Sequence, residues 1–376
     1  MKKHKWRRSP DSSAPVHRPP APGDTPGPGS NLEAARFAQV FCVRTGRGSH
    51  FLKIDELCDG TAEVNLSQRQ IRAALSIYAM VDPTMKLRGI ALFLLFAISG
   101  NSGAQTTNLS AAPPQTVRLA FWNIQWFPGR HPNASVASER SQIASVHRDM
   151  RRIYADVIGM EEVRDFDNAT IAISPLAGFK VDVVSDFPPR EGQDVGQQVA
   201  IASRLPPLSA WVEMWKPNGA LVPPRGFAFA AYEVAPRHIL LVYGVHLKSN
   251  RGEIAEDIAI REESMQQLIA HIHEMNEAYG KLGSVSCIVG GDFNTAPDDP
   301  RFAGETTTRL LRDNGFSWCW QNIPFAQRIS LPADKLFPAA CFDHIFVRNA
   351  ELNSARVTET SRRSSDHNAI FAELQL

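Results

Sequence analysis

Cysteine is scarce in this chain, which has five cysteines among 376 residues and no CxxC pair. This scarcity argues against a disulfide-rich scaffold and against a structural zinc site. No apolar run reaches the roughly 18 residues that a membrane-spanning helix needs, which excludes a protein with several membrane spans. An excess of one charge sign is also lacking, since 40 Lys and Arg face 39 Asp and Glu. Because 43% of the residues are hydrophobic, the chain can still bury a sizeable core.

The N-terminal part of the chain differs from the rest. Residues 1–30 are basic and then rich in proline, and such a stretch buries too little apolar surface to fold. Residues 85–104 have the pattern of a secretory signal peptide: two cations, an apolar stretch over 89–98, and small residues at 102 and 104. A buried helix or a single membrane anchor is the alternative. We expect cleavage after Ala104 and a secreted or periplasmic protein with no membrane span in its mature form.

A signal peptide stands at the N-terminus of a nascent chain, but this one begins at residue 85. We interpret residues 1–84 as a disordered or wrongly included N-terminal extension, with translation starting at Met85 or Met80. The alternative is a genuine tail ahead of a signal anchor. Residues 105–376 then form the functional domain, with 26 Lys and Arg against 31 Asp and Glu. Because this domain is mildly acidic, binding of a nucleic acid must depend on a local cationic patch or on a metal ion.

The pattern of residues 105–376 indicates two β-sheets and several helices. Strand candidates rich in Val, Ile and Phe cover 117–122, 157–160, 181–184, 199–203, 227–234, 239–246, 285–290, 343–347 and 369–374. Helix candidates cover 138–154, 253–279 and 306–313. More strands than helices suggest two sheets packed face to face, with helices on the outer faces. In an exported domain Cys319 and Cys341 can form a disulfide, and Cys287 fits within a strand.

Polar motifs follow most of these predicted strands. They are WN at 122–123, EEV at 161–163, HLKS at 246–249, GDFN at 291–294, DHIF at 343–346 and SDH at 365–367. Each motif alone has an ordinary explanation, because polar residues at strand ends are usually turn or cap residues. Together they can bring carboxylate, amide and imidazole groups to one edge of a sandwich. This set supplies what the metal-assisted hydrolysis of a phosphoester requires.

That reaction needs a cation and an activated water. A divalent cation neutralises the phosphate, and Glu162 is suited to hold it, with Asn123 as a neutral ligand or an orienting group. Asp292 and Asn294 are two residues apart on a predicted turn, so they can hold one water or one phosphate oxygen between them.

Two histidines complete the set. His367, with Asp343 as its carboxylate partner, and separately His246 can donate to phosphate or leaving-group oxygens. With them the ordered motifs resemble the endonuclease/exonuclease/phosphatase superfamily, whose best-known members are similar to deoxyribonuclease I. The resemblance covers residues 116–376. It implies an α+β fold, the four-layer α/β/β/α sandwich. It also implies an enzyme that cleaves phosphoesters with Mg²⁺ or Mn²⁺, with Ca²⁺ as a candidate structural ion.

The resemblance also implies roles for further residues. It supports the roles given above, adds Asp366 as a metal-contacting residue, and places Asn123 and Lys248 near the substrate. Arg164 would reach a DNA backbone or minor groove. Its alternative is a surface salt bridge to a neighbouring aspartate, Asp165 or Asp167.

The chain departs from the pattern of the superfamily at three positions. Glu161 stands where glutamine is frequent, and its extra negative charge could tighten the metal or recruit a second ion. Gln125 stands where some repair nucleases carry a metal-binding aspartate. His344 stands where tyrosine is common, and we interpret it as structural.

Three functions remain open from the sequence. The first is a secreted, monomeric nuclease that acts on DNA or RNA. The second is a phosphomonoesterase or a sphingomyelinase-like phospholipid phosphodiesterase on the same fold, for which residues 316–320 are a candidate aromatic membrane hairpin. The same segment can instead be a buried strand next to Cys341. The third is a binding module without enzymatic activity, which is disfavoured because every expected catalytic position is filled.

Overall fold

The computed structural model describes residues 40–45, 48–53, 116–189 and 195–376 of the chain. The predicted signal peptide at 85–104 and the proposed start sites Met80 and Met85 lie outside these ranges. Two strands are described within residues 1–84: β1 (Val40–Thr45) and β2 (Gly48–Lys53) pair antiparallel as a hairpin. No helix in the described ranges is long and apolar enough to cross a membrane.

Two mixed six-stranded sheets lie within residues 116–376. The first sheet has the strand order β13-β14-β3-β4-β6-β5 and the second has the order β11-β12-β10-β9-β8-β7. One pair is parallel in each sheet, β3 with β4 and β9 with β10, and the other pairs are antiparallel. The first-sheet strands are β3 (Thr116–Phe127), β4 (Val157–Val163), β5 (Lys180–Val184), β6 (Gln198–Ser203), β13 (Glu351–Thr358) and β14 (Ala369–Gln375). The second-sheet strands are β7 (Pro207–Met214), β8 (Gly226–Ala235), β9 (His238–His246), β10 (Ser284–Asp292), β11 (Ser317–Trp318) and β12 (Asp343–Arg348).

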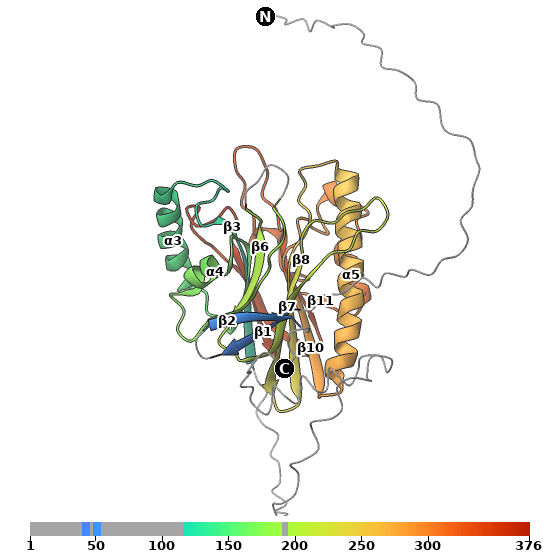
Figure 1. Cartoon of the computed structure of the whole chain (residues 1–376). Coiled ribbons are helices and arrows are strands. Elements are labelled where there is room, and N and C mark those ends of the chain that lie inside the picture. Colours follow the sequence, from blue (N-terminus) through green and yellow to red (C-terminus); the bar gives the residue numbers. More distant parts are fainter. Residues whose placement is uncertain (1–39, 46–47, 54–115, 190–194) are drawn as a thin grey trace, which may run out of the picture. The chain divides into compact units, whose positions relative to one another are not determined.

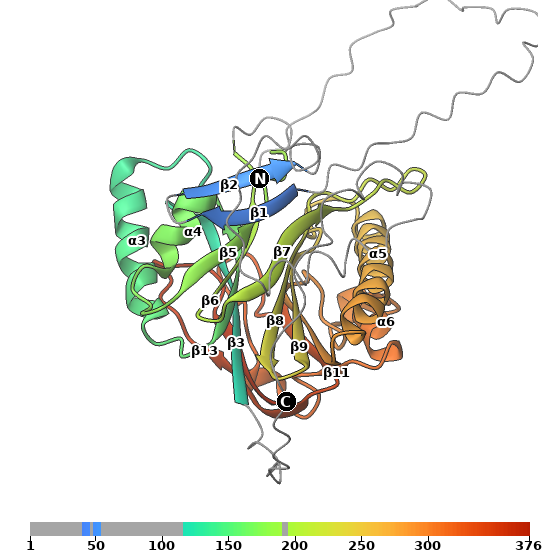
Figure 2. The same cartoon turned by 60° about the horizontal axis from the view of Figure 1, so that its bottom comes forward.

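Helices cover the outer faces of both sheets. Helices α3 (Val136–Met150) and α4 (Phe166–Ile173) pack on the first sheet, and α5 (Ile254–Gly280) and α6 (Thr307–Asp313) pack on the second. Figure 1 shows α3 and α4 on the side opposite to α5, and Figure 2 shows α6 beside α5. One apolar core lies between the sheets and one lies under each helical layer. The predicted four-layer α/β/β/α sandwich is therefore confirmed.

Strand β8 illustrates why the central strands are apolar on both faces. Phe227 and Phe229 belong to the core under α5, while Ala228 and Ala230 belong to the core between the sheets. Successive side chains of a strand point to opposite faces, so a strand with a cover on each face needs apolar residues throughout. Helix α5 contributes Leu268 and other residues at three- or four-residue spacing to the same outer core.

The sequence-based element prediction is incomplete at the margins. Each of the nine predicted strands and three predicted helices overlaps an observed element, with ends that differ by a few residues. Within residues 116–376, strands β7 and β13 and helix α4 are absent from that prediction, and β11 falls in the segment 316–320, for which a buried strand was only an alternative. Strands β7 and β13 lie at sheet edges, and their residues are mostly half-exposed, so they lack the continuous apolar run of a central strand. Helix α4 has only eight residues.

The aromatic segment at 316–320 is buried, so the interpretation as a membrane hairpin is wrong. Phe316 and Trp320 lie in the interior, and β11 pairs with β12 at the edge of the second sheet. The predicted disulfide between Cys319 and Cys341 is also wrong, because both thiols are free and buried. They pack in the core between the sheets, where burial raises the pKa of each thiol and favours its neutral form.

Candidate active site

Side chains from both sheets meet where several strands end. Asn123 lies on β3 and Glu162 on β4 of the first sheet. His246 and Asp292 are the last residues of β9 and β10, and Asp343 is the first residue of β12. The strand register places Asp292 opposite both His246 and Asp343, so these three residues form one row across the second sheet. The site is thus built where strands of both sheets end.

Two irregular strands shape the first-sheet side of the site. The pairing of β3 with β4 shifts register after Asn123, and Gln125 and Trp126 in this bulge have positive φ angles of 46° and 48°. Glu162 has a φ of 62° and forms a second bulge, opposite β6. Non-glycine residues rarely adopt this conformation, and strained positions of this kind cluster at functional sites. The backbone N–H of Trp126 donates to Glu162 Oε2 at 3.0 Å, so the two bulges hold the Glu162 carboxylate in place.

The amide of Asn123 joins carboxylates from the two sheets. Its Nδ2 donates to Glu162 Oε1 at 3.2 Å and to Asp292 Oδ2 at 3.1 Å. Its Oδ1 accepts from the backbone N–H of Gln125 at 3.0 Å. Asn123 therefore presents its nitrogen to the carboxylates, which is the orienting arrangement rather than that of a direct oxygen ligand.

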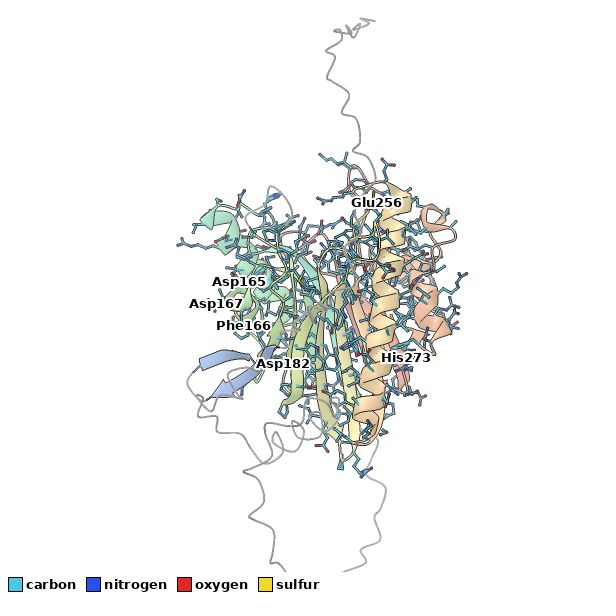
Figure 3. The ribbon with its side chains drawn as sticks, turned by 45° about the vertical axis from the view of Figure 1, so that its right-hand side comes forward. Asp165, Phe166, Asp167, Asp182, Glu256 and His273 are labelled. Atoms are coloured by element: carbon cyan, nitrogen blue, oxygen red, sulfur yellow. The ribbon has the colours of Figure 1, made fainter. Side chains whose placement is uncertain are left out.

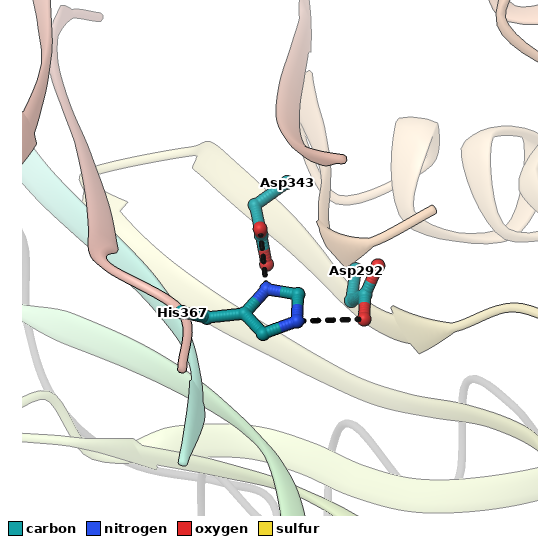
Figure 4. Close-up of side chains that lie close together, drawn as sticks. All are labelled: Asp292, Asp343 and His367. Atoms are coloured by element: carbon teal, nitrogen blue, oxygen red, sulfur yellow. Dashed lines mark hydrogen bonds and ion pairs between the residues drawn. The ribbon is translucent and has the colours of Figure 1, made fainter. Parts of the chain in front are cut away.

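Asp343, His367 and Asp292 form a line of acid, imidazole and acid (Figure 4). His367 Nδ1 lies 2.8 Å from Asp343 Oδ2, and His367 Nε2 lies 3.8 Å from Asp292 Oδ2. Burial opposes a charge on His367, but the carboxylates of Asp343 and Asp292 outweigh it and hold the histidine pKa well above its usual value. Burial and the charge of Asp343 raise the pKa of Asp292 to about 7, against the opposing effect of His367. This arrangement favours a protonated imidazole between two acids.

His246 and Asn294 complete the second-sheet side. His246 is buried, and its Nε2 lies 3.8 Å from Glu162 Oε1 and 3.7 Å from Asp292 Oδ2. The backbone N–H of Asn294 donates to Asp292 Oδ1 at 2.9 Å, and Asn294 Nδ2 donates to the carbonyl oxygen of Leu247 at 3.1 Å. The predicted turn after β10 therefore fixes the Asp292 carboxylate through its own backbone.

Lys248 is not directed to this cluster. Its Nζ forms an ion pair with Asp257 of α5 and donates to the carbonyl oxygen of Ser249 at 3.0 Å. Asp257 is buried, so this pair serves to anchor the start of α5 to the strand end. Sequence reasoning did not predict this contact, which depends on how α5 packs against the end of β9.

Arg164 and Asp366 lie beside the cluster. Arg164 Nη2 forms an ion pair with Glu139 of α3 at 2.6 Å, and not with a neighbouring aspartate. Arg164, Trp126 and Glu162 also line a shallow hollow. Asp366 is half-buried, and its Oδ2 accepts from Gln125 Nε2 at 2.9 Å. Gln125 is thus tied to Asp366.

His344 and Glu161 have environments that sequence reasoning described only partly. His344 Nε2 lies 2.8 Å from the carbonyl oxygen of Thr295, and Trp318 Nε1 donates to His344 Nδ1 at 3.1 Å. Burial lowers the pKa of His344 to about 4, which agrees with a structural role for a neutral imidazole. Glu161 is fully buried, and neither of its carboxylate oxygens has a hydrogen-bond partner.

The residues of this site fit a hard divalent cation. One ligand atom each from Asp292, Asp343 and His367 lies within 4.8 Å of the others. Asp343 Oδ1 and both oxygens of Glu161 are buried without a hydrogen-bond partner, which is costly unless a cation or a proton satisfies them. The donor set is dominated by carboxylate oxygens, which Mg²⁺ and Mn²⁺ prefer.

Comparisons with known proteins agree with this geometry. Residues 120–367 match the Endonuclease/Exonuclease/phosphatase family. An endonuclease/exonuclease/phosphatase from Beutenbergia cavernae DSM 12333 has a similar structure, with a TM-score of 0.53, 17% identity, and coverage of 69% of this chain and 72% of that chain. A second, from Bacteroides vulgatus, has a TM-score of 0.50, 19% identity, and coverage of 70% and 99%. TDP2 from D. rerio, complexed with a single strand DNA product, has a TM-score of 0.50, 15% identity, and coverage of 69% and 99%.

A search of curated protein sequences finds no significant match. The identities to the solved structures are low, so those structures show a shared fold and not a shared substrate. The family match, in contrast, spans both sheets and runs from β3 to the catalytic histidine candidate His367. The chain therefore belongs to the endonuclease/exonuclease/phosphatase family, and its catalytic domain is that of a metal-dependent phosphoester hydrolase.

Proposed function

We propose that this phosphoesterase is an exported nuclease that hydrolyses phosphodiester bonds of DNA, or of RNA, with Mg²⁺ or Mn²⁺. The observation that carries the choice of a polyanionic substrate is a group of arginines around Asp366. Arg130 Nε donates to Gln125 Oε1 at 2.7 Å, and Gln125 in turn donates to Asp366. Arg362 donates to the carbonyl oxygen of Asp366, and Arg363 follows it on the surface.

Arg130, Arg362 and Arg363 form an arginine rim, which provides local positive charge on a domain whose net charge is negative. Cationic side chains beside the site can attract the phosphates that flank the bond to be cleaved, although the whole domain repels them. The structurally similar TDP2 was solved with a single strand DNA product, and this likeness supports the proposal of a nucleic-acid substrate. The buried position of the 316–320 segment removes the feature that favoured a phospholipid substrate.

Glu162 would hold the cation, with Asp366 at its edge and Asn123 orienting the carboxylates. When bound, a divalent cation supplies charge neutralisation at the phosphate and at the leaving oxygen. Asp292, fixed by the backbone N–H of Asn294 at 2.9 Å, would accept a proton from the attacking water.

Two histidines would contact the phosphate. His367 would donate from Nε2 to a phosphate oxygen, because Asp343 holds its Nδ1 at 2.8 Å and favours the protonated ring. His246 would donate to a second oxygen from the opposite side of Asp292. Two donors and one cation around one phosphate would stabilise charge that develops in the transition state.

Nicking of supercoiled plasmid by the full chain tests this proposal. We expect nicking with Mg²⁺, loss of nicking with EDTA, and loss of nicking in His367→Ala. His273→Ala is the matched control, because His273 lies on the exposed side of α5, away from the site (Figure 3). Release of phosphate or of a lipid headgroup without nicking would instead support the phosphomonoesterase or phospholipase alternative and contradict the nuclease.

Export is a separate part of the proposal. It depends on the signal-like pattern at 85–104 and on cleavage after Ala104. N-terminal sequencing of protein recovered outside the cytoplasm should give Gln105 as the first residue. A mature chain that begins before residue 85 would contradict this interpretation.

A further inference from the structure

Glu161 is a buried acid that the nuclease mechanism does not use. It lies on β4 next to Glu162, but its side chain is 0% exposed and extends between the sheets. A methyl group added at Gly291 of β10 would lie 2.8 Å from Glu161 Oε1, so the carboxyl group reaches the backbone of the second sheet. Burial, and next the charges of Asp343 and Asp292, raise the pKa of Glu161 well above its usual value. The Glu161 carboxyl group therefore lies against the end of β10, where Asp292 follows Gly291 and pairs in register with Asp343 of β12.

The site is rich in carboxyl groups. Five of them gather here, and the described contacts place two imidazoles among them and arginines only at the rim, beside Asp366. The carboxyl groups are those of Glu161, Glu162, Asp292, Asp343 and Asp366.

Nearby lysine and arginine side chains are committed elsewhere. Lys248 pairs with Asp257, and Arg164 pairs with Glu139. One divalent cation at Glu162 would offset only part of the negative charge, and buried charge without compensation is costly.

We infer that Glu161 and Asp343 form a second, inner binding position for a divalent cation between the two sheets. Three oxygen atoms are available as its ligands: Glu161 Oε1, Glu161 Oε2 and Asp343 Oδ1 are buried and have no hydrogen-bond partner. Asp343 Oδ2 is hydrogen-bonded to His367 Nδ1, so Asp343 Oδ1 is the oxygen that can bind the cation.

The inner position is distinct from the outer one at Glu162. Both Glu162 oxygens already accept hydrogen bonds, one from Asn123 and one from the backbone of Trp126, and they face the bulged rim of the first sheet. The ligands of the inner position are hard oxygen atoms, so the expected ion is Mg²⁺ or Mn²⁺. A cation there would fix Asp343, and through it the orientation of His367.

Counting bound Mn²⁺ tests this inference without any substrate, so its outcome is independent of whether the protein cleaves DNA. Electron paramagnetic resonance of free Mn²⁺ during a titration of the full chain should show two ions bound per wild-type chain. Glu161→Gln keeps the size of the side chain and removes its charge, and it should bind one. Glu256→Gln makes the same change at an exposed site on α5 and should bind two (Figure 3).

Two results would overturn the inner site. One is equal Mn²⁺ stoichiometry in Glu161→Gln and in the wild type, with circular dichroism showing both folded. The other result comes from a second variant, for use if Glu161→Gln does not fold. Glu161→Asp keeps the charge on a side chain that is one methylene group shorter, so it should weaken Mn²⁺ binding at one of the two sites by about tenfold or more. Unchanged affinity at both sites in Glu161→Asp contradicts the assignment.

Discussion

His344 gives a quantitative prediction about acid stability. The imidazole is fully buried at the start of β12, and both ring nitrogens are in use. Nε2 donates to the carbonyl oxygen of Thr295, and Nδ1 accepts from Trp318 Nε1. Protonation of Nδ1 would place two donors face to face and a charge in the interior. It would also break the hydrogen bond from Trp318 Nε1, which links β11 to β12.

The size of the effect follows from the shift in pKa. Burial lowers the pKa of His344 from 6.5 to about 4 in the folded protein. Because the folded pKa is the lower one, the unfolded chain binds the proton more readily, and stability falls as the pH drops from 6.5 toward 4. The free energy of unfolding should therefore decrease by about 2.5 kcal/mol between pH 7.5 and pH 4.5 on account of this residue alone.

Urea unfolding of the wild type and of His344→Gln at the two pH values measures this contribution. Glutamine can keep one acceptor and one donor but does not titrate, so the variant should be less stable at pH 7.5 by about 1–3 kcal/mol. At pH 4.5 the difference between the two proteins should shrink, or reverse, by about 2.5 kcal/mol. A difference in stability that is the same at both pH values would refute the reasoning, because the other titrating groups are common to both proteins.

Three further predictions concern the site and its supports. Asp343→Asn should lower kcat by about 10²- to 10⁴-fold in a nicking assay with an unchanged melting temperature, because His367 loses its carboxylate partner. Gly291→Ala should lower the free energy of unfolding in urea by about 3 kcal/mol or more, since φ is 131° and the new methyl group would lie 2.1 Å from a carbonyl oxygen of β9. Arg261→Met should cost about 3–5 kcal/mol in the same assay, because it leaves Glu305 buried without its 2.8 Å ion pair.

The sequence predicted the fold and most of the site for a physical reason. His246, Asp292 and Asp343 stand at the ends of apolar strands, and strand ends in a two-sheet sandwich meet at a common edge. The bulges that aim Glu162 and Trp126 could not be predicted, since their positive φ angles depend on contacts across the sheet and not on local preference.

Ion pairs with helix residues were the other limit of the sequence-based prediction. Lys248 and Arg164 have the residue types of phosphate-binding groups, but each is paired with an acid on a helix, Asp257 of α5 and Glu139 of α3. Composition and spacing do not reveal such partners. The same limit applies to the wrongly predicted disulfide, because two cysteines near each other in the fold need not form a bond.

Because the site is divided between two sheets, it is complete only when the two sheets are packed together correctly. Asn123 and Glu162 come from one sheet and Asp292 and Asp343 from the other, and a short connection at 204–206 joins β6 to β7. A chain cut at this connection would separate β3–β6 from β7–β14, and the second fragment would carry β13 and β14 of the first sheet. Each fragment alone would be inert, and the return of activity on mixing would report how faithfully the fragments reassemble.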